Sequence, residues 1–338
     1  MRLSWVLAVV LAVTGAFMLG SARADYVDRE DVAGYIDELA REHDFDRGEL
    51  QALFGQARKQ QSILDAIARP AERTLEWHEY RKIFIKPGGF DAGLKFWREH
   101  EAALTRAEQT YGVPARYIVS IIGVETRWGR ITGKYRVLDA LATLGFDYPP
   151  RSKFFRKELT QLLLLAREEG RDPTELYGSY AGAMGYGQFI PSSFRSYAVD
   201  FDGDGQRDIW KNPTDAIGSV ANYFKVHGWQ GTGPVTVQAS MPADPKALAA
   251  LDALANDALK PAHTVGDLRE QGLFVADLAN DTRAALFRMK QPGYAEYWLG
   301  LQDFYVITRY NHSRMYAMAV YQLGQVLAAA RQASAGEG

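Results

Sequence analysis

The chain has 338 residues, of which 47% are hydrophobic and 24% are charged. This composition is typical of a globular protein with a sizeable core, and it excludes a disordered, collagenous or polytopic membrane chain. The formal net charge of −2 gives no support for general affinity for nucleic acid or anionic lipid. Because the chain has no cysteine, disulfides, thiolate zinc sites, cysteine nucleophiles and a lipid-modified cysteine are excluded as well.

Residues 1–24 have the pattern of a secretory signal. Arg2 precedes an uncharged apolar stretch at 3–19, and the small residues Ala22 and Ala24 supply an Ala-x-Ala cleavage site. An uncleaved membrane anchor is the alternative, because the stretch is near the lower end of the roughly 17–25 residues that cross a bilayer. Together with the absence of cysteine, the pattern predicts a protein that is exported to the periplasm with removal of its signal.

The rest of the chain is predicted to be mainly α-helical, with a small β-containing region near its C-terminal end. Apolar residues recur at helical spacing up to about Gly112, beginning with Val32, Tyr35 and Ile36. Beyond Gly231 the sequence contains short, aromatic-rich strand candidates, several of them between 284 and 307. The expected regions are a helical part at 25–231, a β-containing part at 232–307 and a C-terminal part at 308–338 whose helix packs back on the first.

The first segment with unusual chemistry is a helix that begins near Pro114. On this helix Tyr117, Ile121 and Glu125 are four residues apart, so the carboxyl group shares the apolar stripe. Burial penalises the ionised form of a carboxyl group, and Trp128 could add an apolar wall, so Glu125 is a candidate general acid. The alternative is that Glu125 forms an ion pair with a cation at the helix end, such as Arg127 or Arg130.

A glycine-rich segment follows at 178–193. Its closely spaced glycines allow the backbone to approach another surface, and Gln188 offers both a donor and an acceptor to a polyhydroxyl or acetamido ligand. These features favour a sugar-binding groove. The alternative is a tight connection before a helix that starts near Pro191, which needs no ligand.

An acidic loop follows the glycine-rich segment. Asp200, Asp202, Asp204 and Asp208 place side-chain oxygens at positions 1, 3, 5 and 9 of a calcium-binding loop. Gly205 is at position 6, and the carbonyl of Gln206 is at position 7. Position 12, where an EF-hand has a bidentate glutamate, is Lys211, and Asp215 is the candidate replacement ligand. The pattern predicts a structural calcium ion, with a solvated Asp/Gly turn as the alternative.

Five strings of the sequence closely resemble the lytic murein transglycosylase B family of bacteria. They are GVETRWG (123–129), LDALATL (138–144), SYAGAMGYGQFIPSS (179–193), DAIGSVANY (215–223) and YVITRYN (305–311). The resemblance extends over nearly the whole chain after residue 24. It implies a lysozyme-like helical core with additional helices, a small β domain and a cation-binding loop. Since no lipobox cysteine is present, the chain is similar to the soluble form of the family.

The resemblance also implies roles for individual residues. Glu125 corresponds to the single catalytic acid/base. The residues expected to contact the sugar strand are Ser179, Gln188, Tyr223, Tyr310, Asn311 and Tyr316, although the spacing of Tyr310 and Tyr316 alone favours core tyrosines. The residues expected in the calcium site are Asp200, Asp202, Asp204, Gln206, Asp208 and Asp215.

The activity implied is cleavage of the β-1,4 bond between N-acetylmuramic acid (MurNAc) and N-acetylglucosamine (GlcNAc) in peptidoglycan, which leaves 1,6-anhydro-MurNAc ends. Glu125 would act first as an acid and then as a base, with no organic cofactor. Peptidoglycan glycan strands are the implied partner, and cell-wall remodelling proteins stay open as further partners.

Two other functions are compatible with the sequence. A hydrolytic muramidase would need a second carboxyl group about 5–9.5 Å from Glu125, for which Asp139 and Asp147 are the candidates. A calcium-braced peptidoglycan-binding protein without activity would leave the position of Glu125 unexplained.

Overall fold

The computed structural model describes residues 25–68, 75–86 and 88–336. The segment expected to act as a signal, 1–24, therefore lies outside the described residues. The chain divides into two compact units, with the boundary between Gln56 and Ala57. Within the described residues, no helix combines the length and the apolar character needed to cross a membrane.

In the first unit, the described residues form two helices, α1 (Glu30–His43) and α2 (Arg47–Gln56). The apolar stripe predicted for α1 is confirmed, because Val32, Tyr35 and Ile36 are all buried. The ring of Tyr35 packs edge-on against Phe54, with 6.0 Å between the ring centroids. The two helices therefore meet through the residues that the helical spacing selects.

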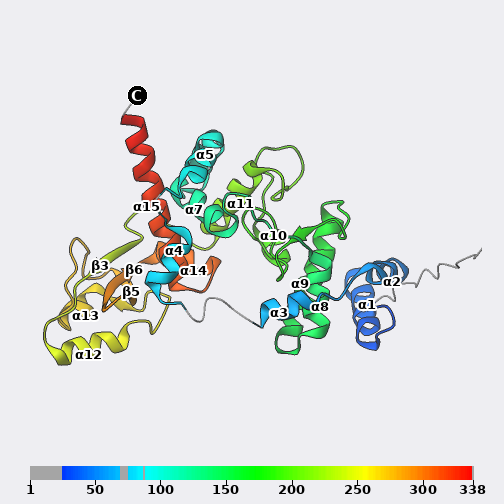
Figure 1. The fold of residues 1–338 in the computed structure, drawn as a ribbon, viewed down its shortest axis with the longest axis horizontal. Coiled ribbons are helices and arrows are strands. Elements are labelled where there is room, and N and C mark those ends of the chain that lie inside the picture. Colours follow the sequence, from blue (N-terminus) through cyan, green and yellow to red (C-terminus); the bar gives the residue numbers. More distant parts are fainter. Residues whose placement is uncertain (1–24, 69–74, 87, 337–338) are drawn as a thin grey trace, which may run out of the picture. The chain divides into compact units, whose positions relative to one another are not determined.

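The second unit contains the remaining elements (Figure 1). Its helices are α3 (Gln61–Ile67), α4 (Trp77–Phe84), α5 (Asp91–Glu99), α6 (Glu101–Tyr111), α7 (Ala115–Thr126), α8 (Val137–Asp147), the 3-10 helix η2 (Pro149–Arg151), α9 (Ser152–Glu168), α10 (Pro191–Tyr197), α11 (Pro213–Val226), α12 (Pro245–Leu254), α13 (Val265–Glu270), α14 (Gln302–Tyr310) and α15 (Arg314–Gly336). Its strands are β1 (Tyr135–Arg136), β2 (Tyr177–Gly178), β3 (Thr236–Ala239), β4 (His263–Thr264), β5 (Arg283–Gln291) and β6 (Tyr294–Gly300).

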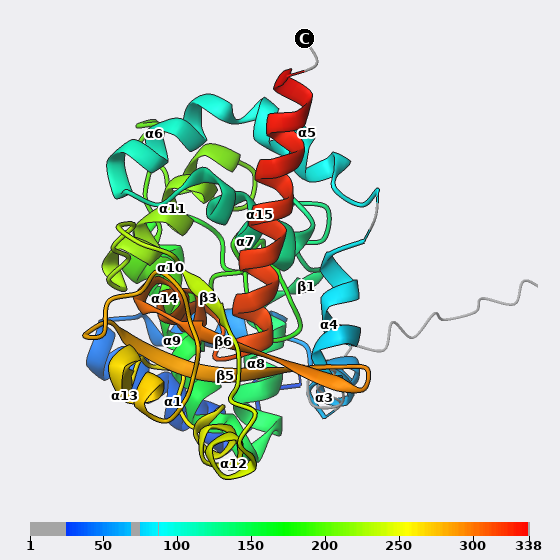
Figure 2. The same cartoon turned by 90° about the vertical axis from the view of Figure 1, so that its left-hand side faces the viewer.

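Helix α7 lies at the centre of the helical part of this unit. It contacts α5, α6, α11 and the long C-terminal helix α15, which runs beside it in Figure 2. Most of its residues are buried, including the polar Ser120 and Thr126. Because most residues of α7 are buried, this helix needs neighbours on several sides, and the four contacting helices supply them.

Strands β1 and β2 form a two-stranded sheet, whereas the larger sheet has four strands in the order β3-β6-β5-β4, all antiparallel. Strands β5 and β6 form a hairpin through Pro292 and Gly293, and Gly293 has a φ of 81° that favours glycine. Helices α12 and α13 pack on the sheet through Leu251, Val265 and Leu268. The predicted small β-containing region is confirmed, and the chain is mainly helical elsewhere.

One expected strand region is wrong. The strand candidates were expected to continue to residue 307, but the chain forms α14 from Gln302 onward. The ring of Phe304 stacks on Phe287 of β5, with 4.7 Å between centroids, and Ile307 is also buried. Tertiary packing at the three-residue spacing of a helix therefore overrides the strand preference of the aromatic and β-branched residues.

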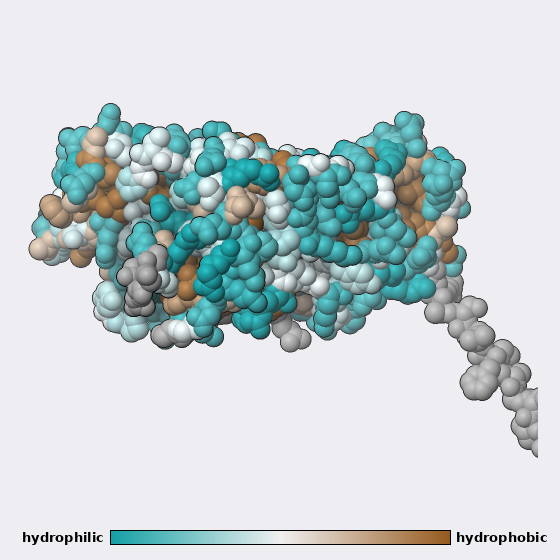
Figure 3. All heavy atoms as spheres, turned by 90° about the horizontal axis from the view of Figure 1, so that it is seen from above, coloured by the Kyte–Doolittle hydropathy of each residue, from teal (hydrophilic) through white to brown (hydrophobic). Residues whose placement is uncertain are grey.

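The surface has the distribution expected of a globular protein. On the face seen in Figure 3, hydrophilic residues predominate, and hydrophobic side chains form separate patches. The apolar groups that hold the second unit together are instead buried, as Leu141 of α8 and Leu162 of α9 illustrate.

Candidate active site

Glu125 lies in the last turn of α7, where its side chain is half-buried. Its Oε1 atom accepts a hydrogen bond from the hydroxyl of Tyr316, with 2.5 Å between the oxygens. Tyr316 belongs to α15 and is only 2% exposed. The contact between α7 and α15 therefore brings together two residues that are 191 positions apart in the sequence.

The backbone turns sharply immediately after Glu125. Arg127 and Trp128 both have positive φ angles, 50° and 58°, and this ends the helix. The turn directs the Trp128 ring back along α7, where its Nε1 donates to the carbonyl of Val119 at 3.0 Å. A Cβ on Gly123 would lie 2.7 Å from this ring. Trp128 thus occupies the space over Gly123.

Two tyrosine hydroxyls are strongly affected by the carboxyl group of Glu125. Burial, followed by the charge of Glu125, raises the pKa of Tyr316 well above its ordinary value. The same two causes, in the same order, raise the pKa of Tyr310. Both phenols therefore stay protonated, and the Tyr316 hydroxyl remains a donor to Glu125.

The sugar contact expected for Tyr316 needs correction. With 2% of the residue exposed, its ring has no free face to offer a sugar, and its hydroxyl is committed to Glu125. The structure therefore agrees with the core role that the spacing favoured. Tyr316 positions the catalytic candidate instead of lining a groove.

Tyr223 and Tyr310 belong to an aromatic cluster with Phe189. The ring centroids of the two tyrosines are 4.7 Å apart, and each lies 5.9 Å from that of Phe189. Their hydroxyls donate to backbone carbonyls, Tyr223 to Arg309 and Tyr310 to Gly187, each at 2.6 Å. The cluster fixes the end of α14, where Asn311 follows as a half-buried residue.

The glycine-rich segment approaches other parts of the chain as closely as its composition predicts. A Cβ on Gly187 would lie 2.8 Å from the hydroxyl of Tyr310. Gln188 has a φ of 51°, and its Nε2 donates to the carbonyls of Thr132 and Gly185. Gln188 therefore ties this segment to the loop that follows α7, so its donor group is already used within the protein.

Ser179 has a different arrangement. Its hydroxyl oxygen accepts hydrogen bonds from the backbone N–H groups of Ala181 and Ala183, at 3.2 and 3.1 Å. Because a hydroxyl has two acceptor positions and one proton, the proton remains available for a ligand oxygen. The segment then enters α10 at Pro191, which agrees with the connection to a helix that the sequence also allowed.

The two carboxyl groups considered as a second catalytic acid have structural partners. Asp139 is 4% exposed and forms two hydrogen bonds with the guanidinium of Arg136, at 2.9 and 2.8 Å. Its Oδ1 also accepts from the backbone N–H of Arg58. Asp147 pairs with Lys59, with 3.0 Å between nitrogen and oxygen. These contacts give both residues a role in packing α8.

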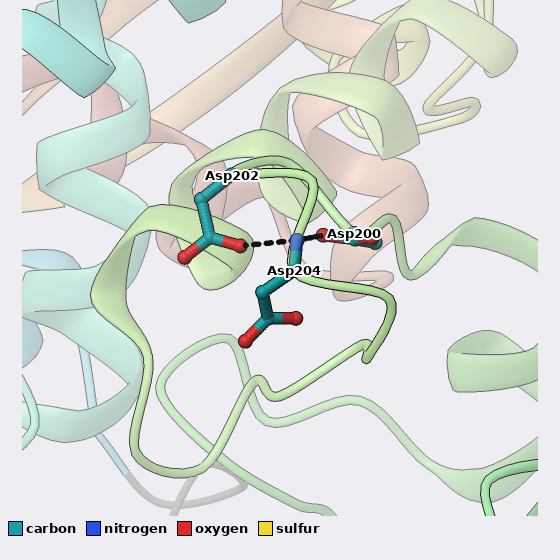
Figure 4. Close-up of side chains that lie close together, drawn as sticks. All are labelled: Asp200, Asp202 and Asp204. Atoms are coloured by element: carbon teal, nitrogen blue, oxygen red, sulfur yellow. Dashed lines mark hydrogen bonds between the residues drawn. The ribbon is translucent and has the colours of Figure 1, made fainter.

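The acidic loop brings three of its carboxylates together. Oxygens of Asp200, Asp202 and Asp204 all lie within 4.8 Å of one another, and all three residues are exposed. Figure 4 shows them around one turn, where Asp200 and Asp202 both accept from the backbone N–H of Asp204. Since calcium binds oxygens at roughly 2.3–2.6 Å, oxygens on opposite sides of one ion are about 5 Å apart. The three carboxylates could therefore hold a metal ion.

Asp215 is not one of the three clustered carboxylates, and its role as a replacement ligand stays a prediction. It is completely buried in the first turn of α11, and its oxygens accept backbone N–H groups of the acidic loop. Oδ1 accepts from Phe201 at 2.7 Å and Oδ2 from Asp208 at 2.8 Å. Desolvation by burial raises the pKa of Asp215, and these N–H groups oppose the rise. Asp215 therefore fastens both ends of the loop from inside.

Asp208 is also outside the cluster. Its Oδ1 accepts from the backbone N–H groups of Trp210 and Lys211, and its Oδ2 lies 3.5 Å from Arg171. Next to it, Arg207 donates to Glu169 at the end of α9, an ion pair that was not predicted from the sequence. These two residues are 38 positions apart, so no local pattern in the sequence identifies the pair.

Comparison with known proteins identifies the family. The model of the transglycosylase SLT domain matches residues 28–325. The chain is 47% identical over 317 residues to membrane-bound lytic murein transglycosylase B of Escherichia coli strain K12, an alignment that covers 91% of this chain and 85% of that protein. The chain belongs to the lytic murein transglycosylase B family.

Solved structures of this family have the same fold. Catenated lytic transglycosylase SltB1 from Pseudomonas aeruginosa has a TM-score of 0.86 at 54% identity, with 91% of this chain and 100% of that chain covered. Lytic transglycosylase Slt35 from Escherichia coli, solved in complex with calcium, has a TM-score of 0.82 at 46% identity, with 91% and 96% covered. The chain is thus a lytic transglycosylase that acts on peptidoglycan, and the family resemblance and fold class inferred from the sequence are confirmed.

Proposed function

We propose that Glu125 is the single acid/base with which this lytic transglycosylase cleaves the MurNAc–GlcNAc bond and leaves 1,6-anhydro-MurNAc ends. The observation that supports the assignment is the hydrogen bond from the buried hydroxyl of Tyr316 to Oε1 of Glu125. A half-buried carboxyl group held by one donor keeps a defined orientation. Asp139 and Asp147, the candidates for a second catalytic carboxyl group, form ion pairs with Arg136 and Lys59.

In the first step, Glu125 is protonated and donates its proton to the oxygen that bridges the two sugars. Because Oε1 accepts from Tyr316, the proton that is transferred is carried on the other oxygen, Oε2. The bond between the anomeric carbon of MurNAc and the bridging oxygen breaks, and GlcNAc leaves with a free hydroxyl. The 2-acetamido group of MurNAc stabilises the positive charge that develops at the anomeric carbon.

In the second step, Glu125 is ionised and takes the proton of the MurNAc 6-hydroxyl. The 6-oxygen attacks the same anomeric carbon and closes the 1,6-anhydro ring, so no water is consumed and Glu125 is protonated again. Attack within one molecule gains a large entropic advantage when the hydroxyl is held in place. The hydrogen bond from Tyr316 stabilises the ionised form of Glu125 that this step requires.

The residues proposed to contact the sugar strand come from the glycine-rich segment and from the end of α14. Ser179 can donate its hydroxyl proton, and the half-buried Gln188 retains the acceptor of its side-chain amide. Asn311 and the partly exposed portions of Tyr310 complete the set. Tyr223 contacts the ring of Tyr310 and is 8% exposed, so we assign it the support of Tyr310.

We also propose that the acidic loop binds calcium as a structural brace. Asp200, Asp202 and Asp204 would hold the ion, which would neutralise three carboxylates that otherwise repel one another. The solved complex of Slt35 with calcium supports this proposal. In the sequence, the acidic loop lies between the glycine-rich segment and α11. A calcium ion bound by the loop would therefore stabilise the elements that carry Gln188 and Tyr223.

The proposed site of action is the periplasm. Residues 1–24 carry the signal pattern and the Ala-x-Ala cleavage site, and peptidoglycan lies outside the cytoplasmic membrane. The chain has no cysteine to which a lipid anchor could be attached.

Mass spectrometry of the products released from purified cell-wall sacculi tests the proposed reaction. A transglycosylase leaves anhydro ends, which are lighter by one water than the reducing ends that a hydrolytic muramidase leaves. We expect anhydro ends from the purified protein. Reducing ends would identify a muramidase, and intact sacculi would identify a binding protein without activity.

A further inference from the structure

A pocket of about 190 Å³ lies beside the turn that follows helix α7. Its described lining comes from α4, α5, α15 and the turn itself, and it includes Gly123 and Arg127 but not Glu125. Residues two positions apart in a helix point about 200° away from each other, so Gly123 and Glu125 lie on opposite faces of α7. The pocket is therefore separate from the carboxyl group of the proposed reaction.

All the charge in the described lining of this pocket is positive. Lys86, Arg127 and Arg130 contribute to the lining, whereas no aspartate or glutamate does. All three cations are exposed, and within the described ranges of the chain no hydrogen bond or ion pair holds their side chains. The whole chain has a formal charge of −2, so the three cations do not reflect a general excess of basic residues. They repel one another, and an anion between them would remove this repulsion.

Much of the remaining lining is apolar. Ile83 is 43% exposed, and Phe84, Trp128 and Leu323 add aromatic and aliphatic surface. The ring of Trp128 is fixed in place, because its Nε1 donates to the carbonyl of Val119 at 3.0 Å. The pocket thus combines three cations with an apolar wall that is already formed.

This combination favours a phosphate group over a carboxylate. A carboxylate offers two oxygens in one plane, whereas a phosphate group offers three acceptor oxygens that point in different directions. Arginine binds phosphate through its planar fork, and lysine binds it as a point charge. The volume is below the roughly 300–1,000 Å³ of pockets that enclose a whole drug-sized ligand, so it suits one charged group with a small apolar substituent.

We propose that this pocket binds the phosphate group of an organic phosphate. Lys86, Arg127 and Arg130 would donate to the phosphate oxygens, and the attached apolar group would lie against Ile83 and Phe84. A bound phosphate would link the turn after α7 to the end of α4. A phospholipid headgroup and a soluble phosphate ester share this chemistry. None of these residues acts in the reaction proposed for Glu125, so the inference does not depend on that reaction.

Isothermal titration calorimetry of the purified protein with phenyl phosphate tests the proposal, because this probe carries both a phosphate group and an apolar ring. We expect saturable binding of phenyl phosphate. Inorganic phosphate lacks the ring and is expected to bind about tenfold more weakly. Phenol lacks the phosphate group and is expected to show no binding.

Two variants assign the binding to this pocket. Arg130→Gln should weaken the binding of phenyl phosphate about tenfold, the effect of one lost charge-assisted hydrogen bond. Lys86→Gln should weaken it about threefold, because the ammonium group acts as a point charge. Arg127 is left unchanged, since its φ of 50° forms the turn. Lys246→Gln removes an exposed cation of α12 outside the pocket and should bind like the wild type, and melting curves check the fold of each variant.

Sedimentation with lipid vesicles distinguishes the two sources of the phosphate group. If phosphatidylglycerol vesicles capture the wild type but not Arg130→Gln, and phosphatidylcholine vesicles capture neither, the ligand is a lipid headgroup. If the wild type binds phenyl phosphate but neither kind of vesicle captures it, the ligand is a soluble phosphate ester.

The absence of saturable phenyl phosphate binding by the wild type would overturn the proposal. Equal affinities of the wild type, Arg130→Gln and Lys86→Gln would overturn it as well, because the phosphate would then bind elsewhere. Equal affinities for phenyl phosphate and inorganic phosphate would contradict the role of the apolar wall. The release of anhydro products is measured separately, so a failure of the proposed reaction is distinguishable from a failure of this site.

Discussion

At the scale of single residues, the site depends on one carboxyl group and the phenol that holds it. Tyr316 donates to Glu125 across 2.5 Å from a buried position, and burial together with the negative charge of Glu125 keeps this phenol protonated. The hydroxyl of Tyr316 is therefore available as a donor to Glu125.

Tyr316→Phe is expected to lower kcat by roughly tenfold to a hundredfold, because a hydrogen bond to a charged group contributes about 1.5–3 kcal/mol. The change removes only the hydroxyl, so the ring should still fill its place against α7. Turnover of peptide-free glycan strands measures the effect, and circular dichroism checks the fold.

Tyr297→Phe is the matched control, since Tyr297 also donates to a carboxylate, Asp252, at 2.7 Å. It should lose some stability but keep the turnover of peptide-free strands. If both variants lost activity equally, the loss in Tyr316→Phe would reflect general destabilisation and not the position of Glu125.

The sequence alone predicts Glu125 as the catalytic candidate, but it does not predict the hydrogen bond with Tyr316. The four-residue spacing of Tyr117, Ile121 and Glu125 places the carboxyl group on a buried helix face, and this is local information. Tyr316 is 191 residues away, and its hydrogen bond depends on how α15 packs on α7. Likewise, the pattern of the acidic loop placed Asp200 in a cation site, but it could not show that Asp215 accepts backbone N–H groups from inside the fold.

At the scale of elements, α7 and the turn after it form the rigid support of the site. Gly123 allows the ring of Trp128 to lie directly on the helix, and a Cβ there would be 2.7 Å from the ring. The sequence predicted a helix ending near this point. It could not predict that two successive residues with positive φ direct Trp128 backward, because the Trp128 ring also packs against Gly93 of α5, a tertiary contact.

Gly123→Ala is therefore expected to destabilise the second unit by roughly 1–3 kcal/mol, the usual cost of an overpacked site, and to lower activity by displacing Trp128. Thermal unfolding followed by tryptophan fluorescence measures both effects. Gly34→Ala in α1 is the control, because a Cβ there meets nothing within 4 Å, and a small gain in helix stability is expected. An unchanged melting temperature in Gly123→Ala would contradict the packing described here.

Calcium should raise the melting temperature by a few degrees and a chelator should lower it, because a ligand that binds only the folded state stabilises it. Asp204→Asn should remove this response, since Asp204 belongs to the carboxylate cluster. Asp281→Asn changes an exposed acid elsewhere and should keep the response. If adding calcium to the metal-free wild type left the melting temperature unchanged, the proposed structural role of calcium would be wrong.

At acidic pH, the free energy of unfolding should depend on the ion pairs of Glu168. The hydrogen bond from Arg195, with help from Arg207, holds the pKa of Glu168 below its ordinary value of 4.5. As the pH falls below about 4.5, the unfolded chain takes up this proton before the folded one, so the free energy of unfolding decreases. The side chain is 37% exposed, which limits the effect to less than about 1 kcal/mol.

Glu168→Gln should therefore show a shallower loss of stability between pH 5 and pH 3 than the wild type, measured by urea unfolding at several pH values. Glu270→Gln, which removes an exposed acid outside this network, should follow the wild type. A wild-type slope in Glu168→Gln would show that the ion pairs with Arg195 and Arg207 do not contribute to acid stability.

At the scale of the whole molecule, the helical class and the small β region were predictable because both follow from the periodicity of apolar residues. The exception, α14, is short and rich in aromatic residues, and only its packing on β5 decides between helix and strand. The candidate site also depends on tertiary packing. Tyr316 of α15 donates to Glu125 of α7, and Tyr310 of α14 donates to Gly187 of the glycine-rich segment, although these pairs are far apart in the sequence.

The most direct test of this account is the turnover of Glu125→Gln, measured with its binding to glycan strands. The amide is nearly isosteric with the acid and can still accept from Tyr316, but it cannot donate and retrieve the proton. We predict that strand binding and the melting temperature stay at wild-type values while release of anhydro products ceases, and that Glu175→Gln, an exposed acid, remains fully active. Continued formation of anhydro ends by Glu125→Gln would contradict the central claim.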